Sequence, residues 1–306
     1  MSFASMTSVD GVVSRTEDAK ISVLDRGFLY GDSIYEVFRT YSGVPLFYDA
    51  HWARFENSAS LIRLEIGMSS AAMRERIRAT VEATGAPKSR TDVYVRYSIT
   101  RGAGPIDLAP SSALIPTCVV IVKDAPRWPD VCYSRGVTAA VPETRRNSGS
   151  ALDPNIKGGN YLNNVLALME ARALGADDCI MLDGAGLVTE ASNSNVFFVL
   201  DGELVTPSQK AKNLRGLTKA AIHEACRREG FAPREAEIPG EDLRRATECF
   251  LTSATREVMP VASIRLSDGT VRELPEGGGE VTRRVSALYK EYVAEYVREH
   301  AAESFF

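Results

Sequence analysis

Residues 155–164 read Asn155-Ile156-Lys157-Gly158-Gly159-Asn160-Tyr161-Leu162-Asn163-Asn164, and the rest of the chain is best interpreted outward from this stretch. Glycine carries no Cβ, so the pair after Lys157 lets backbone or ligand come close. The sequence then predicts a buried helix that stops at Gly175, because apolar residues recur at helical spacing: Leu162, Val165, Leu166, Met169 and Ala173. Lys157 is either a solvated surface charge, the common case, or an amine that forms a Schiff base.

Downstream segments narrow this choice. Residues 179–200 predict a strand, an Asp-Gly turn, a short strand ending in Glu190, a polar bend and another strand. A helix is then opened by Leu214-Arg215-Gly216-Leu217-Thr218. The segment Thr252-Ser253-Ala254-Thr255-Arg256-Glu257 follows a further strand.

With these motifs in this order, the chain resembles the class IV (fold-type IV) pyridoxal-phosphate aminotransferases. That family holds branched-chain aminotransferases, D-amino acid transaminases, (R)-amine transaminases and aminodeoxychorismate lyases. The resemblance runs from about Ile21 to Val261. It implies a fold of two mixed α+β or α/β domains. We expect a small N-terminal domain over 1–123, a proline-containing linker over 124–133, and a large C-terminal domain over 134–306 that carries Lys157.

Bulk properties suit a two-domain globular protein. The 306 residues are 44% hydrophobic and 25% charged, and the net charge of −4 argues against nucleic acid or an anionic membrane surface as partner. The sequence lacks an apolar run of membrane-spanning length and an N-terminal signal pattern, so we expect a cytoplasmic protein. The three histidines have no ligand spacing, which predicts no metal site. Buried free thiols are expected at all five cysteines: Cys118, Cys132, Cys179, Cys226 and Cys249.

In the first half, short strands are expected within residues 9–24, followed by a glycine-punctuated loop from Asp25 to Gly31 and a strand to Thr40. A helix is expected from an Asp49 N-cap to about Leu64. Its predicted buried stripe is Trp52, Phe55, Ala59 and Ile62. Further elements are expected over 70–83 (helix), 92–100 and 116–123 (strands), 145–154 (a mobile loop over the site) and 280–300 (helix). The last helix is expected to pack through Val281, Val285, Leu288, Tyr292 and Tyr296.

The resemblance implies which residues would bind pyridoxal 5'-phosphate and take part in its chemistry. Lys157 would form the Schiff base and move protons, and Glu190 would hold the ring nitrogen protonated. Tyr161 would donate to the phenolic oxygen. The phosphate would be bound by a helix start and by hydroxyl and guanidinium groups. The residues implied there are Arg54, Leu217, Thr218, Ser253 and Thr255. By periodicity alone Arg54 lies off the buried stripe and would be solvated; the resemblance reverses that interpretation.

Substrate contacts are implied at Tyr30 and Tyr35, with Tyr30 reaching the neighbouring subunit's site. Tyr94 and Arg96 match the Tyr-x-Arg of branched-chain enzymes, which helps to receive carboxylates. Ala254 and Arg256 would also line the pocket. Ala254 stands where many relatives carry a hydroxyl. Arg256 replaces a small residue, so it would either anchor a carboxylate or point to solvent.

The predicted function is transfer of an amino group between small-molecule amino donors and 2-oxo acids, with 2-oxoglutarate as acceptor and a homodimer as the functional form. Tyr30, the Tyr94-Val95-Arg96 segment and residues 160–164 look like branched-chain enzymes and favour the branched-chain L type slightly. Residues 25–27, 35–39 and 252–257 look closer to D-amino acid transaminases and aminodeoxychorismate lyases. D-amino acid or (R)-amine transfer is therefore the alternative, ahead of a lyase or a non-catalytic pyridoxal-phosphate binder.

Overall fold

The computed structural model describes residues 3–111, 113–208 and 213–306 and separates into two compact units. The first unit consists of Met1–Pro126, Ile156–Asn160 and Glu295–Phe306, and the second of Arg127–Asn155 and Tyr161–Ala294. The division after Pro126 falls within the predicted linker, 124–133. Lys157 and the C-terminal end, however, belong to the first unit and not to the predicted C-terminal domain.

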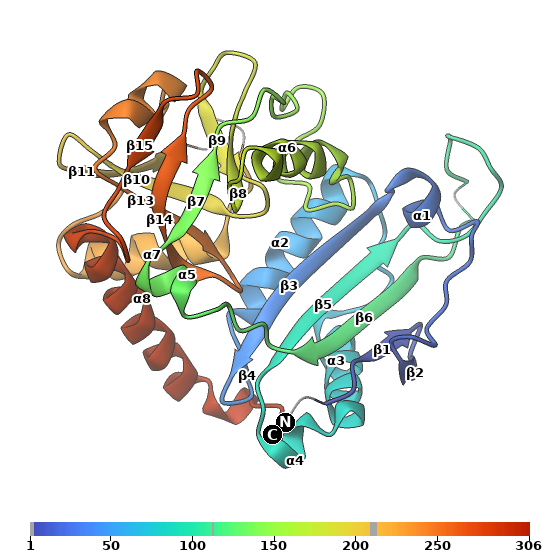
Figure 1. Ribbon diagram of the computed structural model, residues 1–306. Coiled ribbons are helices and arrows are strands. Elements are labelled where there is room, and N and C mark those ends of the chain that lie inside the picture. Colours follow the sequence, from blue (N-terminus) through green and yellow to red (C-terminus); the bar gives the residue numbers. More distant parts are fainter. Residues whose placement is uncertain (1–2, 112, 209–212) are drawn as a thin grey trace. The chain divides into compact units, whose positions relative to one another are not determined.

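The first unit is built on a six-stranded sheet in the order β2-β1-β6-β5-β3-β4, in which all neighbours are antiparallel (Figure 1). Its strands are β1 (Met6–Val9), β2 (Val12–Arg15), β3 (Ser33–Tyr41), β4 (Val44–Pro45), β5 (Val93–Thr100) and β6 (Thr117–Asp124). Its helices are α1 (Arg26–Tyr30), α2 (Tyr48–Leu61), α3 (Ser70–Thr84) and α4 (Ala86–Ser89), followed at the C-terminal end by η3 (Ala301–Glu303).

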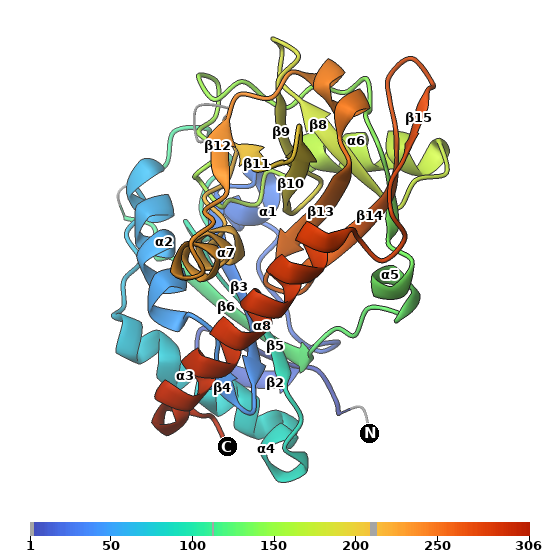
Figure 2. The same ribbon diagram turned by 90° about the vertical axis from the view of Figure 1, so that its left-hand side faces the viewer.

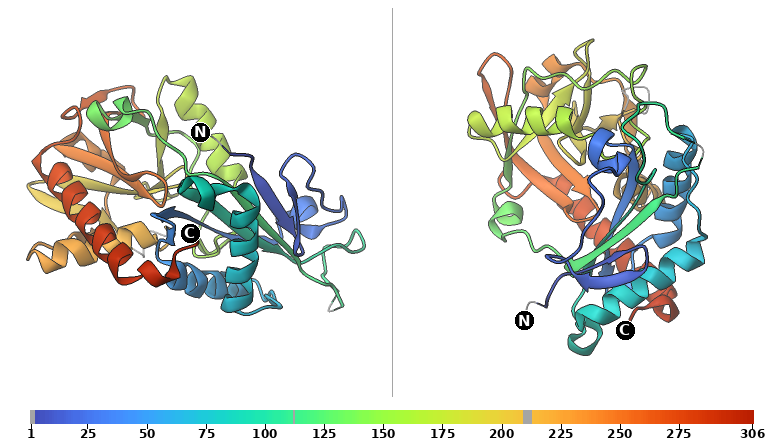
Figure 3. Two further views of the ribbon diagram at one scale, coloured as in Figure 1. Left: turned by 90° about the horizontal axis from the view of Figure 1, so that it is seen from below. Right: turned by 90° about the vertical axis from the view of Figure 1, so that its right-hand side faces the viewer.

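One face of this sheet is covered by α2 and α3 (Figure 3). Side chains alternate between the two faces of a strand, so every second residue of β3 and β5 enters this core. The buried set includes Ile34, Phe38, Val95, Tyr97 and, from α2, Phe55. The other face carries Tyr35 from β3, and Tyr94 and Arg96 from β5. The fold thus presents three of the predicted substrate residues, Tyr35, Tyr94 and Arg96, on the face away from the helices.

The strands at 92–100 and 116–123 and the helix at 70–83 are confirmed within about a residue. Three other predictions for this unit are wrong. The first two strands end at Arg15 rather than Leu24, and the expected loop after Asp25 is the helix α1, capped by the Asp25 carboxylate and ended by Gly31 in the left-handed region. Helix α2 begins after Phe47, which places Asp49 in its first turn instead of at the cap.

The second unit holds a nine-stranded mixed sheet in the order β12-β11-β10-β13-β14-β7-β8-β9, with β15 paired to β14. Its strands are β7 (Val137–Ala140), β8 (Asp178–Leu182), β9 (Val188–Ala191), β10 (Asn195–Leu200), β11 (Glu203–Pro207), β12 (Arg234–Ala236), β13 (Glu248–Ser253), β14 (Glu257–Arg265) and β15 (Val271–Glu273). Its helices are α5 (Val131–Ser134), α6 (Leu162–Ala173), α7 (Leu217–Arg228), η2 (Gly240–Arg245) and most of α8 (Glu280–Glu299), the long red helix of Figure 2.

Every residue of β8, β9 and β10 is buried, as expected for strands of a central sheet with both faces covered. These strands confirm the pattern predicted for residues 179–200, and β9 carries Glu190. Helix α7 packs on β13. Helix α8 has the predicted length but a rotated buried face, formed by Thr282, Val285, Tyr289 and Val293.

Helix α6 has about the predicted span, but it buries the opposite face from the one predicted. Its small residues Ala167 and Ala171 pack with β8, beside which it lies in Figure 1. The predicted buried stripe is turned outward, with Leu162 72%, Met169 62%, and Val165 and Leu166 each 46% exposed. Alanine lets a helix approach a sheet closely, which explains why the small face is the buried one.

All five cysteines are free, and four are buried; Cys132 is half-buried. Burial raises the pKa of the Cys179 thiol to about 12 and of Cys226 to about 11. Among the described residues, no cluster of metal-ligand side chains is found, and none of the helices has the length and apolar character that crossing a bilayer requires.

Candidate active site

The Lys157 segment is held in the first unit by pairing with the edge of β3. The Tyr35 amide donates to the Lys157 carbonyl at 2.9 Å, and the Gly159 amide donates to the Ser33 carbonyl at 3.2 Å. A Cβ on Gly159 would lie 2.7 Å from the Ser33 hydroxyl oxygen, so the close approach requires glycine there. The Lys157 amide also donates to Ser58 Oγ on α2, at 3.2 Å. The lysine backbone is therefore fixed on two sides.

Lys157 and Arg96 meet at the ring of Tyr35. Lys157 Nζ lies 3.4 Å from the Tyr35 hydroxyl and 4.6 Å from its ring centre, and the Arg96 guanidinium lies 3.6 Å from that centre. In the described part of the chain, no carboxylate forms an ion pair with Arg96. Tyr94 neighbours Arg96; burial raises the pKa of Tyr94, and the Arg96 charge opposes this. The structure thus brings four predicted residues together: Lys157, Tyr35, Tyr94 and Arg96.

Arg54 lies on the other side of β3 and is not solvated. Its Nε and Nη2 contact both carboxylate oxygens of Glu36, at 2.7 and 2.8 Å, and Glu36 also contacts His51 Nδ1 at 2.7 Å. Glu36 is fully buried. Burial opposes its ionisation, but the Arg54 charge and the His51 contact together hold its pKa well below the usual range. Burial also lowers the pKa of His51. From the sequence, Glu36 was considered only as part of the 35–39 motif and was given no role of its own.

Tyr30 is the last residue of α1, and the Arg26 guanidinium covers its ring at 4.8 Å. Arg26 is itself buried and paired with Asp32 at 3.1 Å. The ring of Tyr30 thus stacks against the arginine of its own helix. Its predicted substrate role remains a prediction.

In the second unit, Glu190 is 6% exposed and both of its oxygens are bonded. Arg146 Nε donates to Oε1 at 2.9 Å, and the Leu214 amide contacts Oε2 at 3.2 Å. Arg146 itself is only 14% exposed. Sequence reasoning missed this arginine, because it lies in the segment interpreted as a mobile loop.

The start of the segment 145–154 is held by hydrogen bonds to β8 and α6. The Arg146 amide donates to the Leu182 carbonyl at 2.8 Å. Asn163 on α6 accepts from the Asn147 amide at 3.0 Å and donates to the Arg145 carbonyl at 2.9 Å. The arginine pair at the start of the predicted loop, together with the Asn163-Asn164 pair at a helix start, was the available signal. The contact itself spans too many residues to be inferred from local pattern.

Helix α7 begins after Gly216 without a side-chain cap. The first amides of a helix have no partner within the helix, so an uncapped start is suited to an anion. A Cβ on Gly216 would lie 1.8 Å from Asn195 Oδ1, which explains the glycine. Thr218 is buried, and Tyr161 similarly precedes α6 without capping it through its side chain. These placements suit the predicted roles of Leu217, Thr218 and Tyr161 without testing them.

The segment 253–256 forms the turn between β13 and β14. Ser253 Oγ accepts from the Arg256 amide at 3.2 Å, and the Thr255 carbonyl accepts from Trp128 Nε1 at 3.0 Å. Ala254 is half-buried between them. Arg256 is 8% exposed, so its side chain does not point to solvent.

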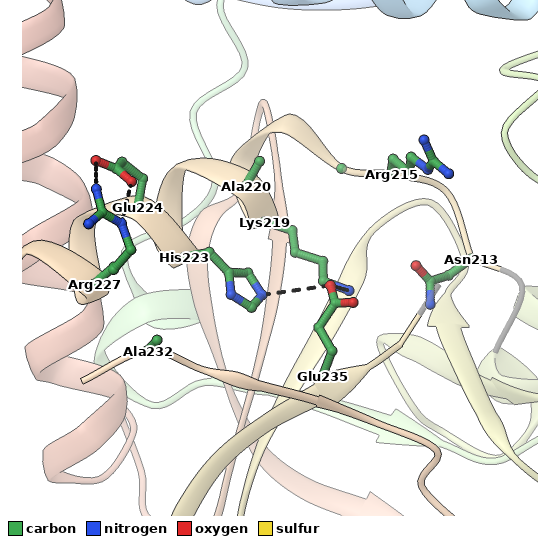
Figure 4. A pocket seen from close by; sticks show the side chains of 10 residues that line it. Asn213, Arg215, Lys219, Ala220, His223, Glu224, Arg227, Ala232 and Glu235 are labelled. Atoms are coloured by element: carbon green, nitrogen blue, oxygen red, sulfur yellow. Dashed lines mark hydrogen bonds and ion pairs between the residues drawn. The ribbon is translucent and has the colours of Figure 1, made fainter. Parts of the chain in front are cut away.

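A pocket of about 370 Å³ flanks the start of α7 (Figure 4). Lys219 projects into it and contacts Glu235 at 3.0 Å and the Pro207 carbonyl at 2.7 Å. His223 lies one turn further along the helix, 3.9 Å from Glu235. Burial lowers the pKa of both Lys219 and His223. None of the predicted site residues except the glycine before Leu217 lines this pocket, so we do not assign the reaction to it.

Comparison with known proteins identifies the family. Residues 33–264 match the model of amino-transferase class IV. The chain is 32% identical over 277 residues to a putative branched-chain-amino-acid aminotransferase of Methanocaldococcus jannaschii, covering 90% of this chain and 92% of that one. It is 29% identical to a D-alanine aminotransferase of Bacillus licheniformis, covering 83% and 87%.

Two solved structures are similar over nearly the whole chain. The branched-chain aminotransferase of Thermoproteus uzoniensis with norvaline gives a TM-score of 0.85 at 28% identity, covering 97% of this chain and 98% of that one. An aminotransferase from Brucella abortus bound to pyridoxal phosphate gives 0.80 at 26% identity, covering 95% and 99%. The predictions of a fold-type IV architecture, of transaminase activity and of pyridoxal phosphate as cofactor are confirmed at this level. The chain therefore belongs to the class IV aminotransferases.

Proposed function

We propose that this aminotransferase moves an amino group between a branched-chain L-amino acid and a 2-oxo acid, with 2-oxoglutarate as acceptor. The observation that carries the proposal is the meeting of Lys157 and Arg96 on the ring of Tyr35. Amino transfer on an amino acid needs an amine for carbonyl chemistry and a cation for a carboxylate. The names of several relatives support the branched-chain type over the D-amino acid type.

The residues of each unit fit pyridoxal phosphate by their chemistry. The first unit offers an amine, and the second offers a buried carboxylate, Glu190, and an uncapped helix start at Gly216. When bound, the cofactor supplies an aldehyde for the amine and a ring that withdraws electrons from substrate Cα. We assign the ring nitrogen to Glu190 and the phosphate to Leu217 and Thr218, with help from Ser253, Thr255 and Arg54. For Arg54, the phosphate would have to share the guanidinium with Glu36.

Lys157 would act as base and acid at substrate Cα. Its backbone is fixed by β3, while its side chain has four rotatable bonds, so Nζ can carry a proton between two nearby atoms without movement of the chain. The Tyr35 hydroxyl, 3.4 Å away, would orient Nζ. Arg96, stacked on the same ring, would receive the carboxylate of a dicarboxylic substrate.

The test is the visible absorption of the purified protein. L-leucine, D-alanine and (R)-phenylethylamine are added separately without an acceptor. Bleaching by L-leucine supports the proposal, whereas bleaching by D-alanine or the amine assigns the alternative. A requirement for an added acceptor during turnover excludes a lyase. Lys157→Ala is the control, and it should neither bleach nor turn over; residual turnover there would remove Lys157 from the mechanism.

A homodimer in the cytoplasm is part of the same proposal. The apolar face of α6, including Leu162 and Met169, is exposed in the single chain, and contiguous apolar patches commonly mark association surfaces. Five free cysteines are typical of a reducing compartment. Sedimentation velocity checks the assembly, and a monomer at micromolar concentration would contradict it.

A further inference from the structure

Arg256 occupies the turn between β13 and β14, where Ser253 and Thr255 are proposed to bind phosphate. Two roles are open for it: direct contact with a substrate carboxylate, or support of the turn. Its guanidinium is almost fully buried, and its contacts distinguish the two roles.

Two nitrogens of the guanidinium, Nη1 and Nη2, already contact neighbouring segments of the second unit, while the buried Nε has no hydrogen-bond partner among the described residues. Its Nη2 lies 2.8 Å from Asp178 Oδ2, a residue at the start of β8 that is 2% exposed. Its Nη1 donates to Asn193 Oδ1 and, at 3.1 Å, to Ser194 Oγ. Both acceptors lie in the bend that follows Glu190 and leads into β10. The side chain thus joins the turn to the bend next to Glu190.

The turn is held from its other side by aromatic residues. Trp128 Nε1 donates to the Thr255 carbonyl at 3.0 Å, and the Tyr133 hydroxyl donates to the Arg256 carbonyl at 3.2 Å. The Trp128 ring also faces the guanidinium carbon at 5.0 Å. The next residue, Glu257, has a φ of 56°, an unusual value for a residue other than glycine. These contacts maintain a backbone shape that the local sequence does not favour.

Asp178 holds the bend as well as the arginine. Its Oδ1 accepts from the Cys179 amide at 2.8 Å and from the Ser192 amide at 3.2 Å. One carboxylate therefore fixes the bend directly and, through Arg256, the turn. A buried charge without its partner is strongly destabilising, so the pair acts as a unit.

We propose that Arg256 is a positioning residue, which together with Asp178 fixes the 253–256 turn relative to Glu190, and that it does not anchor the substrate carboxylate. This inference rests on the proposed function. The charge of Arg256 is offset by Asp178, so a substrate carboxylate would compete with a partner that is already buried.

The experiment compares Arg256→Met, Asp178→Asn and the double variant. Apo protein is titrated with pyridoxal phosphate by absorbance, and KM is measured for the donor that bleaches the wild type. If Arg256 positions the turn, each single variant weakens cofactor binding about tenfold or more, and the double is no worse than the poorer single variant. If Arg256 anchors substrate, Arg256→Met raises only the donor KM, and Asp178→Asn binds cofactor like the wild type. That result overturns the proposal.

Two further variants serve as a milder test of the proposal and as a matched control. Asn193→Ala removes one acceptor of the guanidinium from an exposed residue and keeps the ion pair, so it should fold and weaken cofactor binding by a smaller factor. Unchanged binding in this variant counts against positioning. Arg234→Met is the matched control, because its partner Glu203 and the arginine itself are exposed. A wild type without chromophore would refute the proposed function instead, which keeps the two failures distinguishable.

Discussion

In the first unit, the candidate-site cations Lys157 and Arg96 both lie against the ring of Tyr35. In the second unit, Arg146 and Arg256 each face a buried carboxylate instead. Lys157, Arg96 and Arg146 are all partly buried, and Arg256 is buried. The difference therefore lies in the partners and not in exposure alone, because the second unit places a buried carboxylate against each of its two arginines.

This contrast distinguishes cations that can bind a substrate carboxylate from cations that stabilise the protein structure. A cation stacked on an aromatic ring can accept an incoming carboxylate without first leaving another one. A cation committed to a carboxylate holds protein segments together. Arg54, paired with Glu36 on the far side of β3, shows that the first unit also contains an arginine committed to a buried carboxylate.

The largest effect is expected for Arg146→Met, which leaves Glu190 with the Leu214 amide as its one remaining hydrogen-bond partner among the described residues. We expect kcat to fall at least tenfold and the chromophore maximum to shift, because the carboxylate loses its orientation. Arg146→Lys should recover part of both. Arg172→Met, an exposed arginine of α6, is the control. Wild-type kcat and spectrum in Arg146→Met would erase the distinction between the two kinds of cation.

An intermediate effect is expected for Arg96→Ala. Loss of the stacked guanidinium should raise the KM for 2-oxoglutarate about tenfold and change the KM for a monocarboxylic 2-oxo acid less. Steady-state kinetics with both acceptors measures this. Ser98→Ala, on the same face of β5, should resemble the wild type. An unchanged KM for 2-oxoglutarate would remove Arg96 from the pocket.

The smallest effect concerns pH. His51 has a lowered pKa in the folded state, so the unfolded state binds a proton first as the pH falls. The free energy of unfolding is therefore unaffected by His51 above about pH 6.5 and declines as the pH falls below this pKa of the unfolded state. Glu36 adds a loss only at lower pH, below its unfolded value of about 4.5, because its folded pKa is also depressed.

Urea unfolding of the apo protein at pH 7.5 and 5.5 measures the first window. His51→Asn, which keeps a donor toward Glu36, should lose less stability between the two pH values than the wild type. Some slope remains, because the pKa of His223 is lowered as well. Asn57→Ala, an exposed and non-titrating substitution on the same helix as His51, is the control. A slope in His51→Asn as steep as in the wild type would show that the buried cluster does not discriminate against the charged imidazole.

Local pattern predicted the elements with strong periodicity or clear stops, such as α3, which ends at Gly85, and the strands β5 and β6. It identified an apolar face on α6 but assigned it to the interior, because periodicity says nothing about what covers a face. It placed Arg54 in solvent by spacing, since the buried partner Glu36 comes from another element.

The candidate site shows the same limit. Motif order pointed to Lys157, Glu190 and the start of α7. The structure shows Lys157 bonded to β3, Glu190 bonded to Arg146, and α7 beginning without a side-chain cap. Arg146 and Asp178 were missed, because their roles come from contacts across the sheet rather than from neighbours in sequence. The alternative roles of Arg256 could be narrowed only when its partners were seen.

The pairing of residues 156–160 with β3 has a consequence for local unfolding. The Tyr35 and Gly159 amides are bonded within the first unit, although the chain on both sides of this segment belongs to the second. Amide hydrogen exchange should therefore slow at these two positions in step with the β3–β5 ladder. Partial opening of the second unit would then leave Lys157 in its folded setting beside β3.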